Sequence, residues 1–352
     1  MAEDHRIKYN WIKGVEALEE YAPGGYHPVM VGDMLKDRYH IVDKLGFGGY
    51  STVWLAQDTY LKRYIAVKIN TADSPSRETK VLKALSAPLP PSSPIHPGRD
   101  LLPSSFDDLS IAQLYQQYGE PETVPVTRRD GESLSPNIPA KAVVPLFLGK
   151  YAEKFSLSDA QPLLSDFGEA FSPTLEVRLG QDCHTPPAFR APEAKFEPQA
   201  PLTYPSDIWS LATTIWEIIG MKAIFSTDFV HGDEIVSQHI DVLGPMPSEW
   251  WQRWEGRPRF FDEQGCPTES YQENRWPSLE DSFEIGVQKW RRKLGGAVDE
   301  NEKAAFLDLM RRMLSFRPEE RPTVDEVLTS EWMVKWAFPD YERSQRCSLR
   351  NG

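Results

Sequence analysis

The sequence predicts an α+β fold in which a small β-rich part precedes a larger helical part. Apolar, β-branched stretches stand on both sides of Gly46 and Gly48, the pattern of a β-hairpin, and a strand follows at Ile65-Ala66-Val67-Lys68. Farther along, apolar residues continue at helical spacing from Asp207 to about Ile219. With 352 residues, of which 40% are hydrophobic, the chain can bury the core of two lobes.

The predicted hairpin carries the run Leu45-Gly46-Phe47-Gly48-Gly49-Tyr50-Ser51-Thr52-Val53-Trp54. Glycine lets backbone amides approach an anion without a Cβ clash, so the tip of this hairpin is suited to close over phosphates. Ser51 stands where such loops usually have a third glycine. A plain glycine-rich turn is therefore the alternative for this run taken alone.

A short helix is predicted after the Lys68 strand. Ser74 is the expected N-cap and Pro75 the first helical residue, and Glu78 shares a helix face with the apolar residues that follow. These apolar residues are Val81, Leu82 and Leu85. The helix places Glu78 to pair with Lys68; the alternative is a solvated lysine at the end of a strand.

Four further motifs follow in order. Ser165-Asp166-Phe167-Gly168 is followed by Ala191-Pro192-Glu193, whose Glu193 lies 27 residues beyond Asp166. Ser206-Asp207-Ile208-Trp209-Ser210 then opens the long apolar helix, and Arg317-Pro318-Glu319-Glu320-Arg321-Pro322 comes near the end. In this order and spacing, with the glycine-rich run and Lys68, the motifs resemble those of protein kinases over about residues 21 to 340.

Within the kinases, the sequence is similar to the SR protein kinases and their fungal relatives. The resemblance rests on Gly24-Gly25-Tyr26-His27-Pro28-Val29, Gly32-Asp33, Arg38-Tyr39 and the Ser-Thr-Val-Trp end of the glycine-rich run. Gln238 to Gly244 and Pro247 resemble an insert region of the wider group with cyclin-dependent and mitogen-activated kinases. The resemblance implies a two-lobe kinase fold and phosphorylation of serines in arginine-rich segments.

The resemblance also implies ATP and Mg²⁺ as cofactors and assigns site residues. Asp166 is the implied metal ligand, and Glu193, Asp207 and Arg321 are implied to be structural, with Glu193 and Arg321 forming a buried salt bridge. The implied ATP-binding residues are Leu45, Gly46, Phe47, Gly48, Gly49, Tyr50, Ser51, Val53, Ala66, Lys68 and Glu78.

One expected part is missing. A kinase should carry two strands, a hinge, two helices and a His-Arg-Asp-type catalytic loop between Glu78 and Asp166. Prolines crowd the start of this interval and exclude a ladder strand or a helix interior there: Pro88, Pro90, Pro91, Pro94, Pro97 and Pro103. His96-Pro97-Gly98-Arg99-Asp100 is followed by Leu101 without the loop's lysine and asparagine. We predict a lost block between Asp100 and Leu101, part of the junction between the lobes, and identify no catalytic aspartate.

The resulting domain prediction is an N-terminal extension at 1–32, a kinase N-lobe at 33–95, a proline-rich junction and insert at 96–165, a C-lobe at 166–342 and a tail at 343–352.

In the insert, a helix is predicted from apolar residues at helical spacing before Gly119. We expect this helix to pack on the large lobe, with docking of a partner protein as the alternative. They are Ile111, Leu114, Tyr115 and Tyr118. A loop is expected from Glu120 to Pro139. Trp250, Trp251 and Trp254 are expected to be core or lobe-covering aromatics.

Composition constrains the partners. With 52 acidic and 39 basic residues the net charge is −13, which favours a basic protein substrate or partner, such as an Arg/Ser-rich one, over nucleic acid. No apolar run reaches membrane-spanning length. Cys183, Cys266 and Cys347 lack metal-site spacing, so a reducing intracellular setting, cytoplasm or nucleus, is expected, with the chain a monomer.

Three readings of function remain open from the sequence. The first is a serine/threonine kinase that is catalytically impaired because the catalytic loop is absent. The second is a pseudokinase that binds partners through its lobes. The third is a truncated gene product that folds poorly, for which a partly exposed large lobe is expected.

Overall fold

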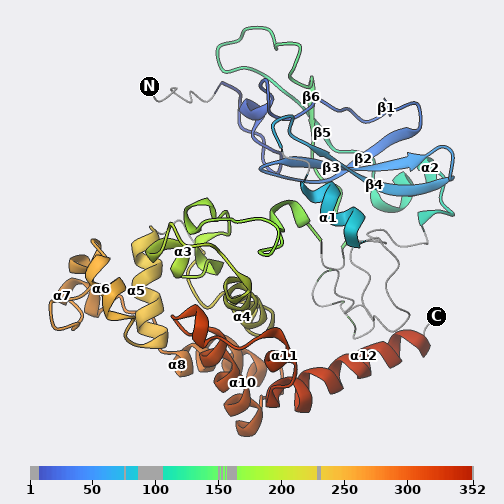
Figure 1. The fold of residues 1–352 in the computed structure, drawn as a ribbon. Coiled ribbons are helices and arrows are strands. Elements are labelled where there is room, and N and C mark those ends of the chain that lie inside the picture. The colour runs from blue at the N-terminus through green and yellow to red at the C-terminus, as the bar shows by residue number, and fades with distance from the viewer. Residues whose placement is uncertain are drawn as a thin grey trace. The chain divides into compact units, whose positions relative to one another are not determined.

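A computed structural model describes residues 8–74, 77–85, 106–149, 165–227 and 231–350, together with residues 151, 154 and 156. The chain divides into two compact units, residues 1–170 and residues 171–352. Among the described residues, the strands lie in the first unit and the second unit is helical, as Figure 1 shows. This is the two-lobe α+β kinase fold that the sequence predicts, and the units are called the small lobe and the large lobe below.

The small lobe contains a four-stranded antiparallel sheet in the order β1-β2-β3-β4. Its strands are β1 (Met34–Leu35), β2 (Tyr39–Gly48), β3 (Ser51–Asp58) and β4 (Arg63–Asn70). β2 and β3 form the predicted hairpin, with Gly48 opposite Ser51. The register shifts twice along β2, on either side of Asp43 and Lys44, and such bulges increase the twist of a sheet.

Both faces of this sheet are covered. Because side chains alternate along a strand, Trp54 and Ala56 pack with Val29 and Val143 on one face, while Leu55 faces the other way. The second face is covered by α2 (Ile111–Tyr118), which begins at a capping box of Ser110 and Gln113 and ends at Gly119.

The predicted helix of the insert is thus confirmed, but the expected packing on the large lobe is wrong. Leu114 is buried against Val42 and Leu55 of the sheet, and the Tyr115 hydroxyl donates a hydrogen bond to the Val42 carbonyl at 2.8 Å. Helical periodicity shows that one face of a segment is apolar without showing which surface covers that face.

The rest of the insert also joins the small lobe. β5 (Thr123–Pro125), which lies in the expected loop, pairs with β6 (Lys141–Val143). Residues of the N-terminal extension share a core cluster with this part, and they include a short 3₁₀ helix, η1 (Leu18–Glu20). The cluster contains Tyr9, Leu18, Tyr21, Tyr26, Val126, Ile138 and Ala142.

The Lys68 strand is followed by α1 (Arg77–Leu85), as predicted. The expected first helical residue, Pro75, lies outside the described residues. So do Asp100 and Leu101, the six prolines before and after them, and the His96–Asp100 motif. A one-turn 3₁₀ helix, η5 (Phe167–Glu169), ends the small lobe directly after Asp166.

The large lobe is built from helices around α4 (Tyr204–Gly220), the predicted long helix, which begins three residues before Asp207. Its other α-helices are α3 (Glu193–Phe196), α5 (Gly232–Leu243), α6 (Ser248–Arg253), α7 (Glu269–Gln272), α8 (Leu279–Phe283), α9 (Lys289–Lys293), α10 (Glu300–Met313), α11 (Val324–Leu328) and α12 (Phe338–Arg350). Two π-helical turns, η9 (Glu284–Gln288) and η11 (Met333–Ala337), join successive helices, and single 3₁₀ turns are η6 (Gly180–Asp182), η7 (Pro187–Phe189), η8 (Arg257–Arg259) and η10 (Pro318–Glu320).

The core of the large lobe forms on one face of α4. Trp209 and Trp216 are buried there, and Trp216 contacts Phe283 and Phe306. The opposite face is exposed, with Ile218 at 69% and Leu211 at 38% of full exposure. An exposed face is usual for a helix at the surface of a protein, so the partly exposed large lobe stays a prediction.

A second aromatic cluster covers the end of the lobe around α6. Trp250 and Trp254 are buried in it, and Trp251 packs at its edge. The expectation that these tryptophans are core aromatics is confirmed. In the described part of the chain, no helix has the length and apolar character to cross a membrane.

Candidate nucleotide site and structural ion pair

The glycine-rich hairpin presents an open tip. A Cβ atom added to Gly46, Gly48 or Gly49 would meet no atom within 4 Å, so packing inside the protein does not require glycine at these positions. The free space leaves the backbone amides accessible to a ligand. Around the tip, Phe47 and Tyr50 are exposed, whereas Ser51 is buried. Leu45 and Val53 are half-buried on the strands that lead to and from the tip.

Lys68 lies on β4 directly opposite Val53 of the hairpin, and Ala66 lies opposite Leu55. The Lys68 ammonium donates hydrogen bonds to the Glu78 carboxylate at 2.9 Å and to the Asp166 carboxylate at 2.8 Å. A strand, a helix and a segment 98 residues farther along the chain therefore bring these three side chains together.

The charges of this group differ in exposure. Glu78 is buried, the Lys68 side chain is 31% exposed and the Asp166 side chain is 79% exposed. Desolvation lowers the pKa of Lys68, but the hydrogen bonds to Asp166 and Glu78 outweigh it and raise the pKa above its ordinary value. Lys68 is therefore fully charged at neutral pH, with one partner held inside the lobe and one partner open to solvent.

Asp166 has a left-handed backbone conformation, with φ at 62°. Aspartate tolerates this region better than most residues, because its short side chain bonds locally. The described residues contain no group of three or more histidine, cysteine or carboxylate side chains that could hold a metal. A metal ion at Asp166 would therefore take most of its ligands from water or from a bound phosphate, as Mg²⁺ usually does.

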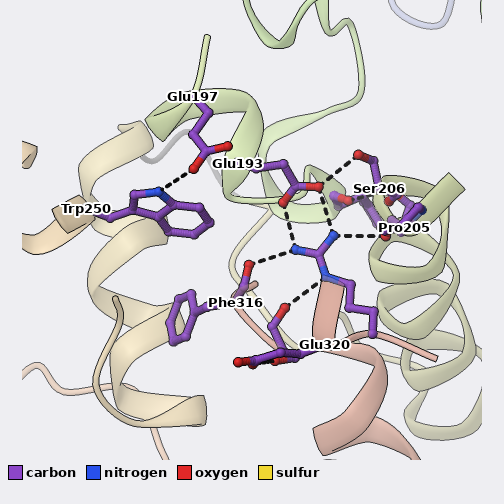
Figure 2. A network of polar contacts seen from close by, with 11 residues as sticks. Glu193, Glu197, Pro205, Ser206, Trp250, Phe316 and Glu320 are labelled. Atoms are coloured by element: carbon purple, nitrogen blue, oxygen red, sulfur yellow. Dashed lines mark hydrogen bonds and ion pairs between the residues drawn. The ribbon is translucent and has the colours of Figure 1, made fainter. Parts of the chain in front are cut away.

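The large lobe contains the predicted ion pair between Glu193 and Arg321. Figure 2 shows the network of polar contacts around Glu193. Two guanidinium nitrogens of Arg321 reach the two carboxylate oxygens of Glu193, at 2.8 and 2.7 Å. The remaining N–H groups donate to the carbonyls of Ser315, Pro205 and Phe316.

Two neighbours complete this network. The Ser206 hydroxyl donates to Glu193 at 2.8 Å, and the Arg321 guanidinium lies 5.1 Å from the centre of the Trp209 ring. The Asp207 side chain, in contrast, makes no hydrogen bond within the described part of the chain, although the residue lies in the first turn of α4.

Sequence reasoning missed a second set of contacts at the hairpin. Lys44 is fully buried and paired with Glu16 of the N-terminal extension, and the Tyr26 hydroxyl donates to the Gly48 carbonyl at 2.7 Å. Tyr26 is part of the Gly-Gly-Tyr-His-Pro motif, but that motif gives no sign of where its side chain points.

Comparisons with known proteins give the following matches. The sequence pattern of the protein kinase domain matches residues 155–333, about half of the chain. A serine/threonine protein kinase of Aspergillus fumigatus is 26% identical over 91% of this chain and 90% of its own length. SRSF protein kinase 3 of Homo sapiens is 41% identical over 28% of this chain and 17% of its own length. The serine/threonine-protein kinase spk-1 of Caenorhabditis elegans is 58% identical over 15% of this chain and 5% of its own length.

The alignment with the Aspergillus protein runs over 381 positions, more than the 352 residues of this chain. Part of that relative therefore has no counterpart here.

Proposed function

We propose that this chain, which belongs to the protein kinase domain family and is SR protein kinase-like, keeps the nucleotide-binding and metal-binding residues of a serine/threonine kinase. We also propose that it is impaired in phosphoryl transfer. The observation that carries the proposal is the contact of the Lys68 ammonium with both Glu78 and Asp166. These residues, with the glycine hairpin, form the part of a kinase site that binds ATP and Mg²⁺.

The chemistry of these groups fits the proposed cofactors. An ammonium with three N–H donors is a strong partner for phosphate oxygens, and two of the donors are used here. Glu78 would keep Lys68 pointed toward the phosphates. The exposed Asp166 carboxylate is a hard oxygen ligand of the kind that Mg²⁺ prefers. Mg–ATP would supply the phosphoryl group for transfer.

The proposed impairment follows from what the sequence lacks. No catalytic aspartate is identified, and removal of a general base typically slows a reaction by roughly 10²- to 10⁴-fold. The loop's asparagine, a second metal ligand, and the hinge that binds the adenine are missing as well. The alignment with the Aspergillus relative needs more positions than this chain has residues, which agrees with lost sequence.

For the substrate, we propose serines in arginine-rich protein segments. The net charge of −13 would attract such basic segments and repel nucleic acid. An intracellular monomer acting in cytoplasm or nucleus is part of the same proposal. Among the residues that the structure describes, Cys183 and Cys266 are both free.

The alternative is a pseudokinase that binds partners without catalysis, and the absence of a catalytic aspartate favours it. A truncated gene product is the third reading. Sequencing of the transcript across codons 95 to 106 separates a splice form from an error in the gene model; an uninterrupted genomic reading frame without an intron there would contradict the lost block.

The central experiment measures Mg–ATP binding by thermal shift beside phosphorylation of an arginine/serine repeat peptide. We expect wild-type protein to be stabilised by Mg–ATP, and Lys68→Ala to lose this effect. Lys80→Ala is the matched control, because Lys80 is an exposed lysine on the same helix as Glu78. If Mg–ATP does not shift the melting temperature of the wild-type chain, the proposed nucleotide site is excluded. The pseudokinase and the poorly folded product would then remain as explanations.

A chimera tests the impairment. A segment that carries the catalytic loop of a serine/threonine kinase is inserted between Asp100 and Leu101, and turnover is compared with that of the original chain. We expect a gain of roughly 10²- to 10⁴-fold, the usual contribution of a general base. Equal turnover of the two proteins, abolished in both by Lys68→Ala, would show that the chain is an intact kinase.

A further inference from the structure

The N-terminal segment, defined here as residues 9–26, contacts the glycine-rich hairpin. Its Tyr26 is 7% exposed, and the Tyr26 hydroxyl donates a hydrogen bond to the Gly48 carbonyl at 2.7 Å. We propose that Tyr26 is a positioning residue for a nucleoside triphosphate, because it holds the Gly48–Gly49 peptide of the hairpin in one orientation. This inference rests on the proposed nucleotide binding.

The backbone pairing of β2 with β3 reaches Gly48, which lies opposite Ser51, and Gly49 lies in the turn beyond this pair. Gly46, Gly48 and Gly49 have no side chains, and the space beside them is open, so local packing does not restrict their backbone. In the described part of the chain, no side chain other than that of Tyr26 makes a hydrogen bond to residues 46–49. Beyond the pairing of Gly48 with Ser51, this hydroxyl is therefore the side-chain contact that orients the Gly48–Gly49 peptide.

A fixed carbonyl also fixes an amide. The peptide group is planar and trans, so the N–H of Gly49 points to the side opposite the Gly48 carbonyl. With the carbonyl turned toward Tyr26, the Gly49 N–H points away from the N-terminal segment. An N–H group held in place before the ligand arrives binds a phosphate oxygen with less loss of conformational freedom than a mobile one.

Tyr26 is itself held firmly. Its backbone N–H donates to the Glu20 carbonyl at 2.9 Å, and its ring lies 5.4 Å from that of Tyr21. The preceding glycines are both required. Gly24 has a φ of +90°, and a Cβ on Gly25 would come within 1.8 Å of the Glu20 carbonyl oxygen.

The same turn is joined to the Lys68 strand. The N–H groups of Ala72 and Asp73, just beyond the end of β4, donate to the carbonyls of Gly25 and Gly24 at 3.1 and 2.9 Å. The turn before Tyr26 therefore links the hairpin tip to the strand that carries the second phosphate-binding group of the proposed site.

A second contact holds the base of the hairpin. The buried Lys44 ammonium pairs with Glu16, which also accepts a hydrogen bond from the Tyr21 hydroxyl. This ammonium lies 5.3 Å from the ring centre of Trp54 and 5.5 Å from that of Phe47. The N-terminal segment thus binds the hairpin at its base and at its tip, and Tyr26 is the contact at the tip.

The test compares Tyr26→Phe with Tyr115→Phe in the full chain. Tyr115 is a matched control, since its hydroxyl also donates to a carbonyl of β2, that of Val42 at 2.8 Å, but far from the tip. The dissociation constant for a non-hydrolysable Mg–ATP analogue is measured by calorimetry. One hydrogen bond is worth a factor of about 3 to 10, so we expect Tyr26→Phe alone to weaken binding by that factor. Equal affinity of wild type and Tyr26→Phe overturns the inference.

Hydrogen exchange without nucleotide keeps the inference testable by itself. We expect faster exchange of the amides of residues 46–50 in Tyr26→Phe than in wild type or Tyr115→Phe, with melting temperatures of the two variants alike. Unchanged exchange at the tip overturns the inference. A wild-type chain that binds no Mg–ATP analogue overturns the proposed function instead, and the exchange result then decides whether Tyr26 holds the tip.

Discussion

The ion pairs of the two lobes differ in burial and in how many of their N–H donors already have partners. In the large lobe, Arg321 is fully buried, and five hydrogen bonds to Glu193 and three backbone carbonyls use all five of its N–H groups. In the small lobe, Lys68 is partly exposed, bonds to two carboxylates and keeps one N–H without a partner among the described residues. The first arrangement has no capacity for a ligand. The second has a spare donor and an exposed carboxylate, which suits groups that exchange partners when a ligand binds.

The largest effect is expected from breaking the saturated pair. Glu193→Gln leaves the Arg321 charge buried without a counter-charge, which typically lowers the free energy of unfolding by about 3 to 5 kcal/mol. Chemical denaturation measures the change. The double variant Glu193→Met with Arg321→Met should lose less than either single variant, because no uncompensated charge remains. An unchanged stability of Glu193→Gln would show that the pair is not structural.

A pH effect of intermediate size is expected beside that pair. His239 is fully buried between Trp209 and Phe225, and its ring nitrogens have no partner in the described part of the chain. Desolvation, and then the charges of Arg321 and Lys195, lower its pKa to about 3. The unfolded chain takes up this proton near pH 6.5, so stability is full above that pH and falls below it by about 1.4 kcal/mol per pH unit. His239→Phe should lose this part of the acid sensitivity, as followed by melting temperature from pH 7 to 4.5; an unchanged profile would contradict the assignment.

The small lobe should show a slope of the opposite sign. Asp43 is buried on β2, and desolvation, opposed by the hydrogen bond from the Lys44 amide, raises its pKa to about 6. The folded chain therefore holds a proton that the unfolded chain releases near pH 4, and stability falls as pH rises from about 4 to 6. Asp43→Asn should be more stable relative to wild type at pH 7 than at pH 4, by about 1 to 3 kcal/mol. Parallel stability curves for the two proteins would contradict this.

The smallest effect on stability is expected at the functional pair. Lys68→Ala removes an ion pair in which the lysine side chain is 31% and the Glu78 side chain 12% exposed, so the unfolding free energy should fall less than for Glu193→Gln while Mg–ATP binding is lost. Denaturation and nucleotide titration of the same preparation measure both. A loss of several kcal/mol would place Lys68 with Arg321 as a structural cation and remove the contrast between the lobes.

Much of the fold follows from local patterns. The hairpin at Gly46 to Gly49, the strand of Lys68 and the helices at 111–118 and 204–220 were all predictable, because each repeats its apolar residues at the spacing of one kind of element. The surface that each element covers was not predictable in the same way. The helix at 111–118 packs on the sheet of the small lobe and not on the large lobe, since its apolar stripe fits either surface.

Some residues of the candidate site were predictable from the sequence and others were not. Lys68, Glu78 and Asp166 were found from motifs whose order and spacing are distinctive, although 98 residues separate the lysine from the aspartate. Glu16, Lys44 and Tyr26 were missed. A charged lysine in the middle of a strand normally indicates a solvated face, and only a carboxylate from a distant segment makes its burial possible.

The sequence by itself determined the protein kinase family and the lysine and its two acidic partners that we propose for the nucleotide site, because these depend on residue types and their order along the chain. The tertiary structure alone decided that the N-terminal segment and the insert pack in the small lobe, and that the Tyr26 hydroxyl bonds the Gly48 carbonyl. These contacts join residues far apart in the chain. Whether a buried polar group there is satisfied depends on three-dimensional proximity, which no local pattern records.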